Sequence, residues 1–274
     1  MATDKLRVLV FGAHPDDCDF KAAGVAALYT GLGHSVKMVS VTNGDAGHQT
    51  MGGAPLAWRR RMEAQAAGQC VGAEYVVLDN HDGELLPTLE NRRAVIRLIR
   101  SYRPHLILAP RLWDYHPDHR ATAQLVQDAV YLLTVPNAVS DAYHMRQMPV
   151  VAYVEDHFRK PVPFAPDVVV AIDEVVEKKV VALACHVSQM YEWLPYNREE
   201  EDQVPESPSE RRAWLRAFLD PRFRASAEAY RAKLAELYGE QRASQVKYAE
   251  AFEISEYGEQ ASPEDLRRLF PFFE

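Results

Sequence analysis

Apolar, strand-like runs alternate with helix-like segments through the first half of the chain, and this alternation constrains the fold more than any other feature. Strand-like runs are expected at residues 6–13, 35–43, 75–78 and 105–110. Segments with helical patterning follow them at residues 20–33, 56–72, 90–103 and 118–134. This β-α-β-α order predicts a parallel sheet with helices on both faces, because parallel strands must be joined by crossover connections.

The second half of the chain continues the sheet and then changes character. Two further strands and a long helix are expected at residues 150–154, 167–172 and 173–191. A polar, acidic and proline-bearing segment at 197–212 predicts a surface loop, and helical composition follows it. We therefore predict an α/β fold, a Rossmann-like three-layer sandwich with a mostly parallel sheet. Residues 1–197 would form this core, and residues 198–274 an acidic loop and a helical C-terminal extension packed on the same domain.

The bulk composition argues against several classes of function. The chain has 274 residues, of which 47% are hydrophobic and 26% charged, so it can bury a large core. Its net charge of −8 argues against nucleic acid or an anionic membrane as a partner, and no apolar run approaches the roughly 18 residues of a membrane span. The N-terminus lacks a signal-peptide layout, and three scattered cysteines indicate no disulfide framework, so a cytoplasmic protein is expected.

Two short motifs bring metal-binding residue types to the ends of two expected strands. The first strand is followed by His14, Asp16 and Asp17 in the sequence HPDD. The fourth strand is followed by Asp114, His116, Asp118 and His119, around the sequence HPDH. In a doubly wound sheet of order 3-2-1-4-5, strands one and four are neighbours at the crevice where ligands bind. The expected fold therefore brings the two motifs together, although they lie far apart in the sequence.

The residue types in the two motifs suit a catalytic metal site. Two imidazoles and one carboxylate form a common zinc set that leaves a position open for water, and zinc lowers the pKa of that water toward about 7. A carboxylate outside the set can take the water's proton, and a further histidine can protonate a leaving amine or stabilise an oxyanion. The sequence offers His14, Asp17 and His119 as ligands. It offers Asp16 as the base and His116 as the acid. Spacing alone separates neither the two aspartates nor the two histidines of the second motif.

Each motif also has an ordinary structural explanation. Asp and Pro are common turn residues, either aspartate could cap the next helix, and a His-x-x-His pair could be solvated surface. Asp114 could orient a ligand imidazole, or it could begin a loop or cap a helix. The functional interpretation is favoured because both motifs end strands that are expected to be neighbours.

The two motifs together resemble those of the PIG-L/LmbE-like zinc deacetylases, which hydrolyse the N-acetyl group of glucosamine-containing substrates. Four shorter segments also look like family motifs, namely TNGDAG at 42–47, RRMEA at 60–64, HDGEL at 81–85 and ACHVSQ at 184–189. The resemblance covers about residues 6–190, with a weaker match at 248–258. One departure is Cys18, which stands where family members often have Glu. A buried filler is the favoured role for Cys18, and a redox-sensitive thiol near the metal is the alternative.

The resemblance implies roles for individual residues. The zinc ligands of the family match His14, Asp17 and His119. Its general base matches Asp16, and its acid matches His116. Arg60 and Asp82 match substrate-binding positions, for which a surface salt bridge and a turn are the alternatives. Asp114 and His186 join the substrate-binding candidates, although His186 could equally be a hydrogen-bonded core histidine.

These observations favour a cytoplasmic zinc-dependent N-deacetylase that acts on a small acetamido-sugar conjugate, with Fe²⁺ as an alternative to Zn²⁺. We expect neither a nucleic acid nor a membrane partner, and the resemblance implies a homo-oligomer. Two alternatives stay open, namely hydrolysis of another acylated amine, such as a natural-product intermediate, and a non-catalytic protein that binds a sugar or a metal. A Rossmann nucleotide-binding protein is disfavoured, because FGAHPDD lacks the glycine-rich turn that approaches a pyrophosphate.

Overall fold

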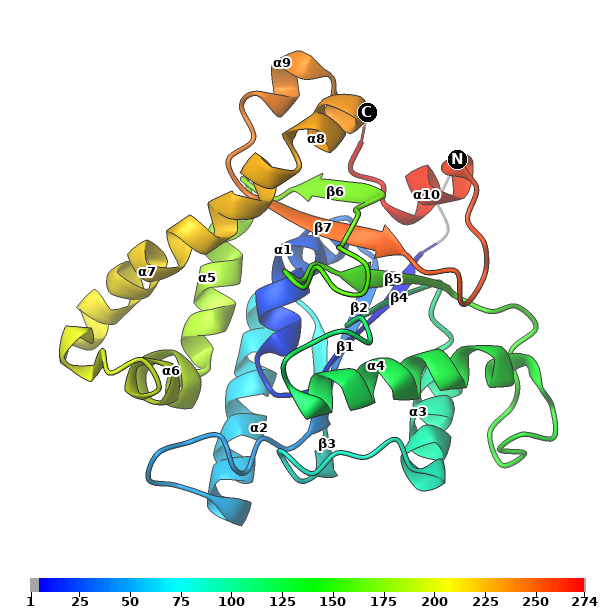
Figure 1. Ribbon diagram of the computed structural model, residues 1–274, viewed down its shortest axis with the longest axis horizontal. Coiled ribbons are helices and arrows are strands. Elements are labelled where there is room, and N and C mark those ends of the chain that lie inside the picture. The colour runs from blue at the N-terminus through cyan, green and yellow to red at the C-terminus, as the bar shows by residue number, and fades with distance from the viewer. Residues whose placement is uncertain (1–4, 274) are drawn as a thin grey trace.

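The structure is a computed structural model that describes residues 5–273. Within that part of the chain, seven strands form one sheet in the order β3-β2-β1-β4-β5-β7-β6 (Figure 1). Their bounds are β1 (Arg7–Gly12), β2 (Ser35–Thr42), β3 (Glu74–Asn80), β4 (Leu106–Ala109), β5 (Val150–Val154), β6 (Val168–Ala171) and β7 (Ala249–Ile254). Strands β1 to β5 are parallel, and β7 runs antiparallel to both β5 and β6. The predicted mostly parallel sheet is confirmed.

Helices cover both faces of the sheet, which gives three layers. The helices of the first part are α1 (Asp17–Gly31), α2 (Gly53–Cys70), α3 (Leu89–Tyr102), α4 (Pro117–Val130) and α5 (Val176–Cys185). Those that follow are α6 (Leu194–Tyr196), α7 (Pro208–Ala229), α8 (Arg231–Tyr238), α9 (Glu240–Ala243) and α10 (Pro263–Leu269). Helices α1, α2 and α5 share one apolar core, and α3 and α4 share the core on the opposite face. None of the helices among the described residues is long and apolar enough to cross a membrane.

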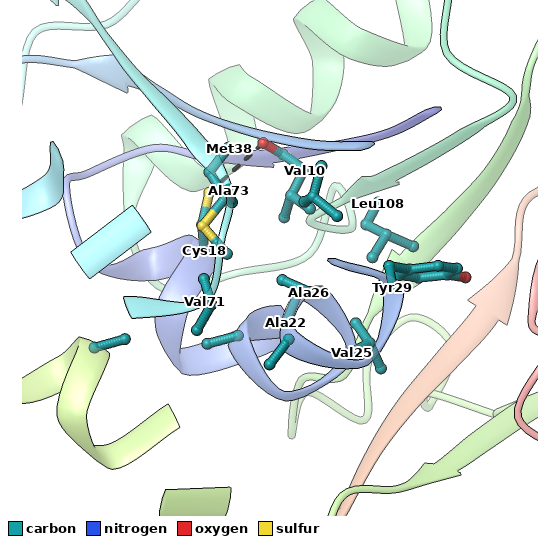
Figure 2. Close-up of a cluster of buried hydrophobic side chains, with 14 of the residues drawn as sticks. Val10, Cys18, Ala22, Val25, Ala26, Tyr29, Met38, Val71, Ala73 and Leu108 are labelled. Atoms are coloured by element: carbon teal, nitrogen blue, oxygen red, sulfur yellow. Dashed lines mark hydrogen bonds between the residues drawn. The ribbon is translucent and has the colours of Figure 1, made fainter. Parts of the chain in front are cut away.

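Strand β1 is apolar throughout because it is buried on both faces. Val8 and Val10 point into the core beneath α1, whereas Leu9 and Phe11 point into the core beneath α3 and α4. Figure 2 shows the first of these cores, where Val10 lies beside side chains from α1 and β2. Cys18 belongs to this core and is fully buried, which agrees with its expected role as a filler.

The topology places the two sequence motifs at the same edge of the sheet. Strand β1 pairs with β2 on one side and with β4 on the other, both in parallel. The chain leaves β1 for α1 on one face and leaves β4 for α4 on the opposite face. The carboxyl ends of β1 and β4 therefore flank the crevice at which open α/β sheets bind ligands.

Two elements differ from the sequence expectations. The helix expected at 173–191 ends at Cys185, because His186 leaves helical geometry, and the chain continues as a π-helix, η2 (Ser188–Trp193). The C-terminal part is mainly helical but also carries β7, which was not predicted. Glu250 of β7 is buried, and it is stabilised by the ammonium of Lys179 (2.6 Å) and by two backbone N–H groups of α1. The division of the chain after residue 197 stays a prediction, and β7 shows that the later part contributes to the same sheet.

Candidate metal centre

The loop after β1 turns tightly into α1 and is fixed by Asp17. One carboxylate oxygen of Asp17, Oδ2, accepts hydrogen bonds from the backbone N–H groups of Ala13 (2.9 Å) and His14 (2.8 Å). Gly12 is required here, because a Cβ at this position would lie 2.6 Å from the Cβ of Asp17. Asp16 has a φ of 136°, which is rare for a residue with a side chain and is found mostly at functional sites.

The second motif is presented by the first turn of α4. His116 is the N-cap of this helix, and its Nδ1 accepts the backbone N–H of Asp118 at 3.2 Å. Pro117 follows at the first helical position, where a missing N–H has no cost. This geometry directs Asp118 and His119 back toward the loop after β1.

Three atoms from the two motifs form a nearly equilateral triangle. His14 Nδ1 lies 3.4 Å from Asp17 Oδ2, His119 Nε2 lies 3.3 Å from the same oxygen, and the two nitrogens are 3.3 Å apart. Zinc ligands at about 2.0–2.1 Å in tetrahedral geometry are separated by about 3.3 Å. The spacing and the donor types of this triad therefore fit a zinc ion that keeps one position open.

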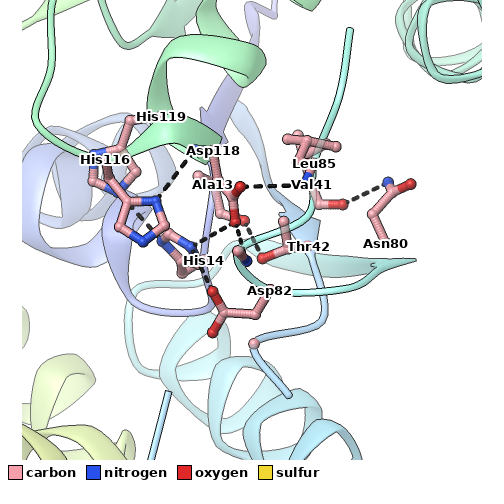
Figure 3. A network of polar contacts seen from close by, with 12 residues as sticks. Ala13, His14, Val41, Thr42, Asn80, Asp82, Leu85, His116, Asp118 and His119 are labelled. Carbon is pink, nitrogen blue, oxygen red and sulfur yellow. Dashed lines mark hydrogen bonds and ion pairs between the residues drawn. The ribbon is translucent and has the colours of Figure 1, made fainter. Parts of the chain in front are cut away.

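Carboxylates outside the triangle orient both histidines. His14 Nε2 lies 3.0 Å from Asp82 Oδ1 and 3.2 Å from Asp118 Oδ2, and His119 Nδ1 lies 3.0 Å from Asp114 Oδ1. Figure 3 shows His14 beside Asp82 and Asp118, with the histidines of the second motif nearby. Metal-binding histidines commonly donate their second N–H to a carboxylate in this way. In the neutral form of each ring, this hydrogen bond places the hydrogen on the outer nitrogen and leaves the inner nitrogen able to bind a metal.

Two other sets of side chains also come within 4.8 Å of one another. They are His14 with His116 and His119, and His14 with Asp82, His116 and Asp118. Asp118 accepts the N–H groups of Gly83 (2.7 Å) and Leu85 (3.2 Å), just as Asp17 accepts those of Ala13 and His14. His116 Nδ1 is occupied by a backbone N–H. Three mutual distances of 3.3–3.4 Å, as in a tetrahedral zinc set, favour the triad of His14, Asp17 and His119 over these two sets.

The carboxylates around the triad favour the positively charged form of both of its imidazoles. Burial lowers the pKa of His14, but hydrogen bonds with Asp118, Asp17 and Asp82 outweigh burial and raise it well above 6.5. Burial also lowers the pKa of His119, but Asp17 and Asp114 raise it to about 9. In the absence of a metal these carboxylates therefore favour an extra proton on the imidazoles, and a metal that binds must displace it.

Asp16 lies beside the triad but outside it. Its side chain is nearly buried, its Oδ1 is 3.7 Å from a guanidinium nitrogen of Arg60, and its backbone N–H donates to the Tyr75 hydroxyl. Burial raises the pKa of Asp16 to about 6, against the opposing effect of the Arg60 charge. A carboxylate with this pKa is ionised at neutral pH and can still accept a proton, as a general base must.

His116 is the histidine that its neighbours leave uncharged. Burial lowers its pKa, and the charges of His14 and His119 lower it further. Since its Nδ1 accepts a backbone N–H, the hydrogen of the neutral ring lies on Nε2. Its ring centroid lies 4.5 Å from that of His14 and 5.2 Å from that of His119, which places the ring beside the triad.

Two of the expected substrate-binding residues, Arg60 and Asp82, have largely buried side chains with partners inside the protein. Arg60 is 2% exposed; it donates to the carbonyls of Pro15 (2.9 Å) and Gly44 (3.1 Å) and lies 3.6 Å from Asp82. A Cβ on Gly44 would come within 2.4 Å of Arg60, so glycine is required there. Arg60 and Asp82 thus organise the loops around the triad, and their contact with substrate stays a prediction.

His186 and Asp114 have partners within the protein. The side chain of His186 is fully buried and lies 2.9 Å from Asp19 Oδ2, so it does not line an open pocket. This geometry fits the alternative interpretation, a hydrogen-bonded core histidine, and contact of His186 with substrate stays a prediction. Asp114 is engaged with His119 and with the backbone of His116, as expected for a residue that orients a ligand.

Other polar contacts were not found by sequence reasoning. Asp118 was noted in the second motif without a role, yet it connects His14 to the loop at 83–85. Glu63 accepts hydrogen bonds from the N–H (3.0 Å) and the hydroxyl (2.6 Å) of Ser188. The RRMEA and ACHVSQ segments therefore contact each other, and their separate family-like patterns were the available indication.

A small open pocket lies beside the triad, at the ends of β1, β4 and β5. Asp17, His119 and Asp114 line one side of it. Lys21 and the buried ion pair of Arg111 and Asp156 line the other. A ligand bound in this pocket would lie directly against the triad.

Comparisons with known proteins indicate the family to which the chain belongs. Residues 9–130 match the family described as "PIG-L: GlcNAc-PI de-N-acetylase". The chain is 31% identical over 210 residues to diacetylchitobiose deacetylase of Thermococcus kodakarensis, a match that covers 71% of this chain and 76% of the relative. It is also 28% identical over 209 residues to 4-oxalmesaconate hydratase of Pseudomonas putida, which covers 72% of this chain and 80% of that relative.

A solved structure shares the fold. The N,N'-diacetylchitobiose deacetylase of Pyrococcus horikoshii superposes with a TM-score of 0.70 at 24% identity, over 92% of this chain and 84% of that one. At that identity the likeness concerns the fold alone. The predicted three-layer α/β architecture is thereby supported independently of the sheet topology.

Proposed function

Since the chain belongs to the PIG-L family of GlcNAc-PI de-N-acetylases, we propose that it is a metal-dependent N-deacetylase of a GlcNAc-type sugar conjugate. Zn²⁺ is the proposed metal and Fe²⁺ the alternative. The observation that carries the proposal is the triangle of His14, Asp17 and His119, whose 3.3–3.4 Å edges match a tetrahedral zinc set.

The proposed chemistry is hydrolysis of an acetamide to an amine and acetate. When bound by the triad, the metal supplies Lewis acidity, which polarises the acetyl carbonyl and lowers the pKa of water. Asp16 takes the proton of the attacking water, because it is ionised at neutral pH and lies next to the ligand Asp17 in the chain. Arg60 keeps this carboxylate ionised and holds the carbonyl of Pro15 in place.

The proposed role of His116 concerns the oxyanion and the leaving amine. Its Nε2–H can donate to the oxyanion that forms when water attacks the carbonyl. Collapse of that intermediate breaks the C–N bond, and the leaving amine must receive a proton. Asp16, which has taken a proton from water, can deliver it to the amine. The resemblance to the family favours His116, which can give up a proton only when its ring carries two, because a neutral imidazole would become an anion.

The experiment that tests the proposal separates metal binding from turnover. The metal content of the purified protein is measured, and amine release is followed with N-acetylglucosamine, diacetylchitobiose and acylated amines without a sugar. The proposal requires release from an acetamido sugar that stops with a chelator. Release only from non-sugar amides would instead support the alternative substrate class, and metal binding without release would support a non-catalytic role.

A second candidate reaction comes from the similarity to a hydratase. The relative named 4-oxalmesaconate hydratase adds water to its substrate, and water addition also needs an activated water and a base. An unsaturated dicarboxylic acid in the same assay panel tests this candidate. Loss of ultraviolet absorbance without amine release from any acetylated sugar would favour hydration.

We further propose that the protein acts in the cytoplasm as a homo-oligomer. The absence of a membrane-spanning helix among the described residues is consistent with this proposal but does not test it. Light scattering coupled to size-exclusion chromatography tests the oligomeric state, since a mass near 31.0 kDa would mean a monomer.

A further inference from the structure

Two of the three cysteines meet in the folded protein, although 115 positions separate them in the sequence. Cys70 is the last residue of α2, and Cys185 is the last residue of α5. Their Sγ atoms lie 3.7 Å apart, and both side chains are partly exposed at the margin of the core that α1, α2 and α5 share. The third cysteine, Cys18, is fully buried in that core. The chain therefore carries one pair of adjacent thiols and one isolated thiol.

The two adjacent sulfurs are within reach of a disulfide bond. The S–S length of a disulfide is about 2.05 Å, so the two atoms need to approach by about 1.7 Å. Cys70 Sγ donates a hydrogen bond to the carbonyl of Ala66 (3.3 Å), and Cys185 Sγ donates to that of Val181 (3.4 Å). Thiols are weak donors, and both of these bonds lie within one helix. Rotation of the two side chains can therefore bring the sulfurs together without separating the helices.

The segments that carry the pair are already fixed to each other. Glu63 lies two turns before Cys70 in α2, and it accepts the backbone N–H (3.0 Å) and the hydroxyl (2.6 Å) of Ser188. Ser188 follows Cys185 by three residues, so these bonds hold α2 against the end of α5 independently of the thiols. Two reactive groups that are held in a fixed geometry react more readily than the same groups on a flexible chain. The pair is therefore preorganised for a reaction between its sulfurs.

The two thiols differ in their access to solvent. The hydrogen bond of the Cys70 sulfur is exposed, whereas that of the Cys185 sulfur is partly buried. Burial raises the pKa of the Cys185 thiol to about 12, and the neighbouring Cys70 and the charges of Asp19 and Glu63 contribute. Cys185 therefore stays protonated near neutral pH. An oxidant from solvent meets Cys70 first, and Cys185 is placed to react second.

We propose that Cys70 and Cys185 are a modification site, at which hydrogen peroxide forms a reversible disulfide between α2 and α5. The thiolate of Cys70 attacks one oxygen of peroxide, the O–O bond breaks, hydroxide leaves, and Cys70 becomes a sulfenic acid. The sulfur of Cys185 then attacks the Cys70 sulfur, the S–O bond breaks, and the proton of Cys185 leaves with the hydroxide as water. Two thiols and one peroxide thus give one disulfide and two waters, with two electrons passing from sulfur to peroxide. A small thiol in excess reverses the reaction by exchange.

A reversible disulfide is compatible with the cytoplasmic location proposed above. Disulfides in that compartment are usually transient and are reduced again by small thiols and their enzymes. The bond would close a loop that contains residues 71–184, and closure of a long loop restricts the unfolded chain. We therefore expect the oxidised protein to be more resistant to unfolding than the reduced protein. The proposal does not rest on the deacetylase function.

A count of free thiols tests the proposal. Zinc-loaded protein is reduced, freed of reductant, exposed to hydrogen peroxide, and then unfolded and alkylated with iodoacetamide. The untreated protein should take up three alkyl groups, and the oxidised protein one, on Cys18. Peptide mapping should find Cys70 linked to Cys185, and dithiothreitol should restore three free thiols. Three free thiols after oxidation, a disulfide that contains Cys18 or joins two chains, or a Cys70 sulfinic acid in place of the disulfide would overturn the proposal.

Three variants and a melting curve complete the test. Cys70→Ser and Cys185→Ser should each form no disulfide within the chain, whereas the matched control Cys18→Ala should form it as the wild type does. Oxidation should raise the Tm of the wild type by about 5 °C or more, reversibly with dithiothreitol, and should leave that of Cys185→Ser unchanged. An oxidised wild type that melts at or below the reduced protein would contradict a bond that fits the native fold. None of these measurements uses an enzyme assay, so failure of the proposed deacetylase function would leave their outcome unaffected.

Discussion

Replacement of Asp16 by Asn should have opposite effects on stability and on catalysis. The variant keeps the shape of the side chain but can neither ionise nor accept the proton of water. In the folded protein the pKa of Asp16 is raised from 3.8 to about 6, so ionised Asp16 destabilises the fold. At about 1.36 kcal/mol per unit, a shift of about two units costs about 3 kcal/mol.

The pH dependence of this cost has a definite sign. Below about pH 4, Asp16 is protonated in both the folded and unfolded states, and the variant should be as stable as the wild type. Between about pH 4 and 6 the folded state binds the proton more tightly, so the wild type loses stability as the pH rises. Above pH 6, metal-free Asp16→Asn should be more stable by up to about 3 kcal/mol. Urea unfolding of both proteins at pH 4 and pH 7 measures the difference.

Catalysis should respond in the opposite direction. Loss of a general base typically lowers the rate by about 10²–10⁴-fold, and metal content should not change because Asp16 lies outside the triad. Initial rates and metal analysis of the same preparations test both expectations. A variant that keeps its metal and a rate within tenfold of the wild type would refute the assignment of Asp16 as the base, and so would loss of the metal.

Four further perturbations test other parts of the site. His119→Ala should lose bound metal, whereas His116→Ala should keep it and lose about 10²–10⁴-fold in kcat; equal metal loss in both would contradict the chosen triad. Asp114→Ala should weaken metal affinity about 10–100-fold, measured by competition with a chelator, because His119 loses its oriented hydrogen bond. The rate should fall at acid pH with a midpoint at or below about 6, since Asp16 must be ionised and a bound cation lowers its pKa; a midpoint above 7 would contradict this role. Gly44→Ala should lower the thermal unfolding temperature, because its Cβ would lie 2.4 Å from Arg60, and an unchanged melting curve would show that Arg60 moves freely.

The position of the candidate site could be predicted from the sequence because the order of the strands in the sheet determines it. Once β1 and β4 are recognised as buried parallel strands, the doubly wound order makes them neighbours, and the two motifs meet. The triad atoms then come within 3.4 Å of one another. The chemistry of metal ligands supplied the residue types, so this part of the site needed no side-chain detail.

The roles of Arg60 and His186 could not be predicted in the same way. Both are functional-looking polar residues in family-like segments, but the depth of each side chain depends on packing between distant elements. Arg60 is covered by the loop at 43–47, where Gly44 leaves room for it, and His186 is buried against Asp19. Sequence patterns identify such residues as important without showing whether they contact the substrate or the loops that hold the site.

Strand β7 was missed for a similar reason. Its sequence, AEAFEI, carries a glutamate at a buried position inside a mainly helical segment. Glu250 is compatible with the sheet only because Lys179 and the N–H groups of α1 compensate its charge. Such a pairing across more than 70 residues of sequence leaves no local pattern.

The most direct test of the account is amine release by protein of known metal content. Protein stripped with a chelator and protein reloaded with about one zinc per chain are compared on N-acetylglucosamine and its conjugates. The account predicts that release is absent from the stripped protein, returns with zinc, and fails to return in His119→Ala. Release that persists in fully stripped protein, or zinc-loaded protein that releases no amine from any acetylated sugar, would contradict it.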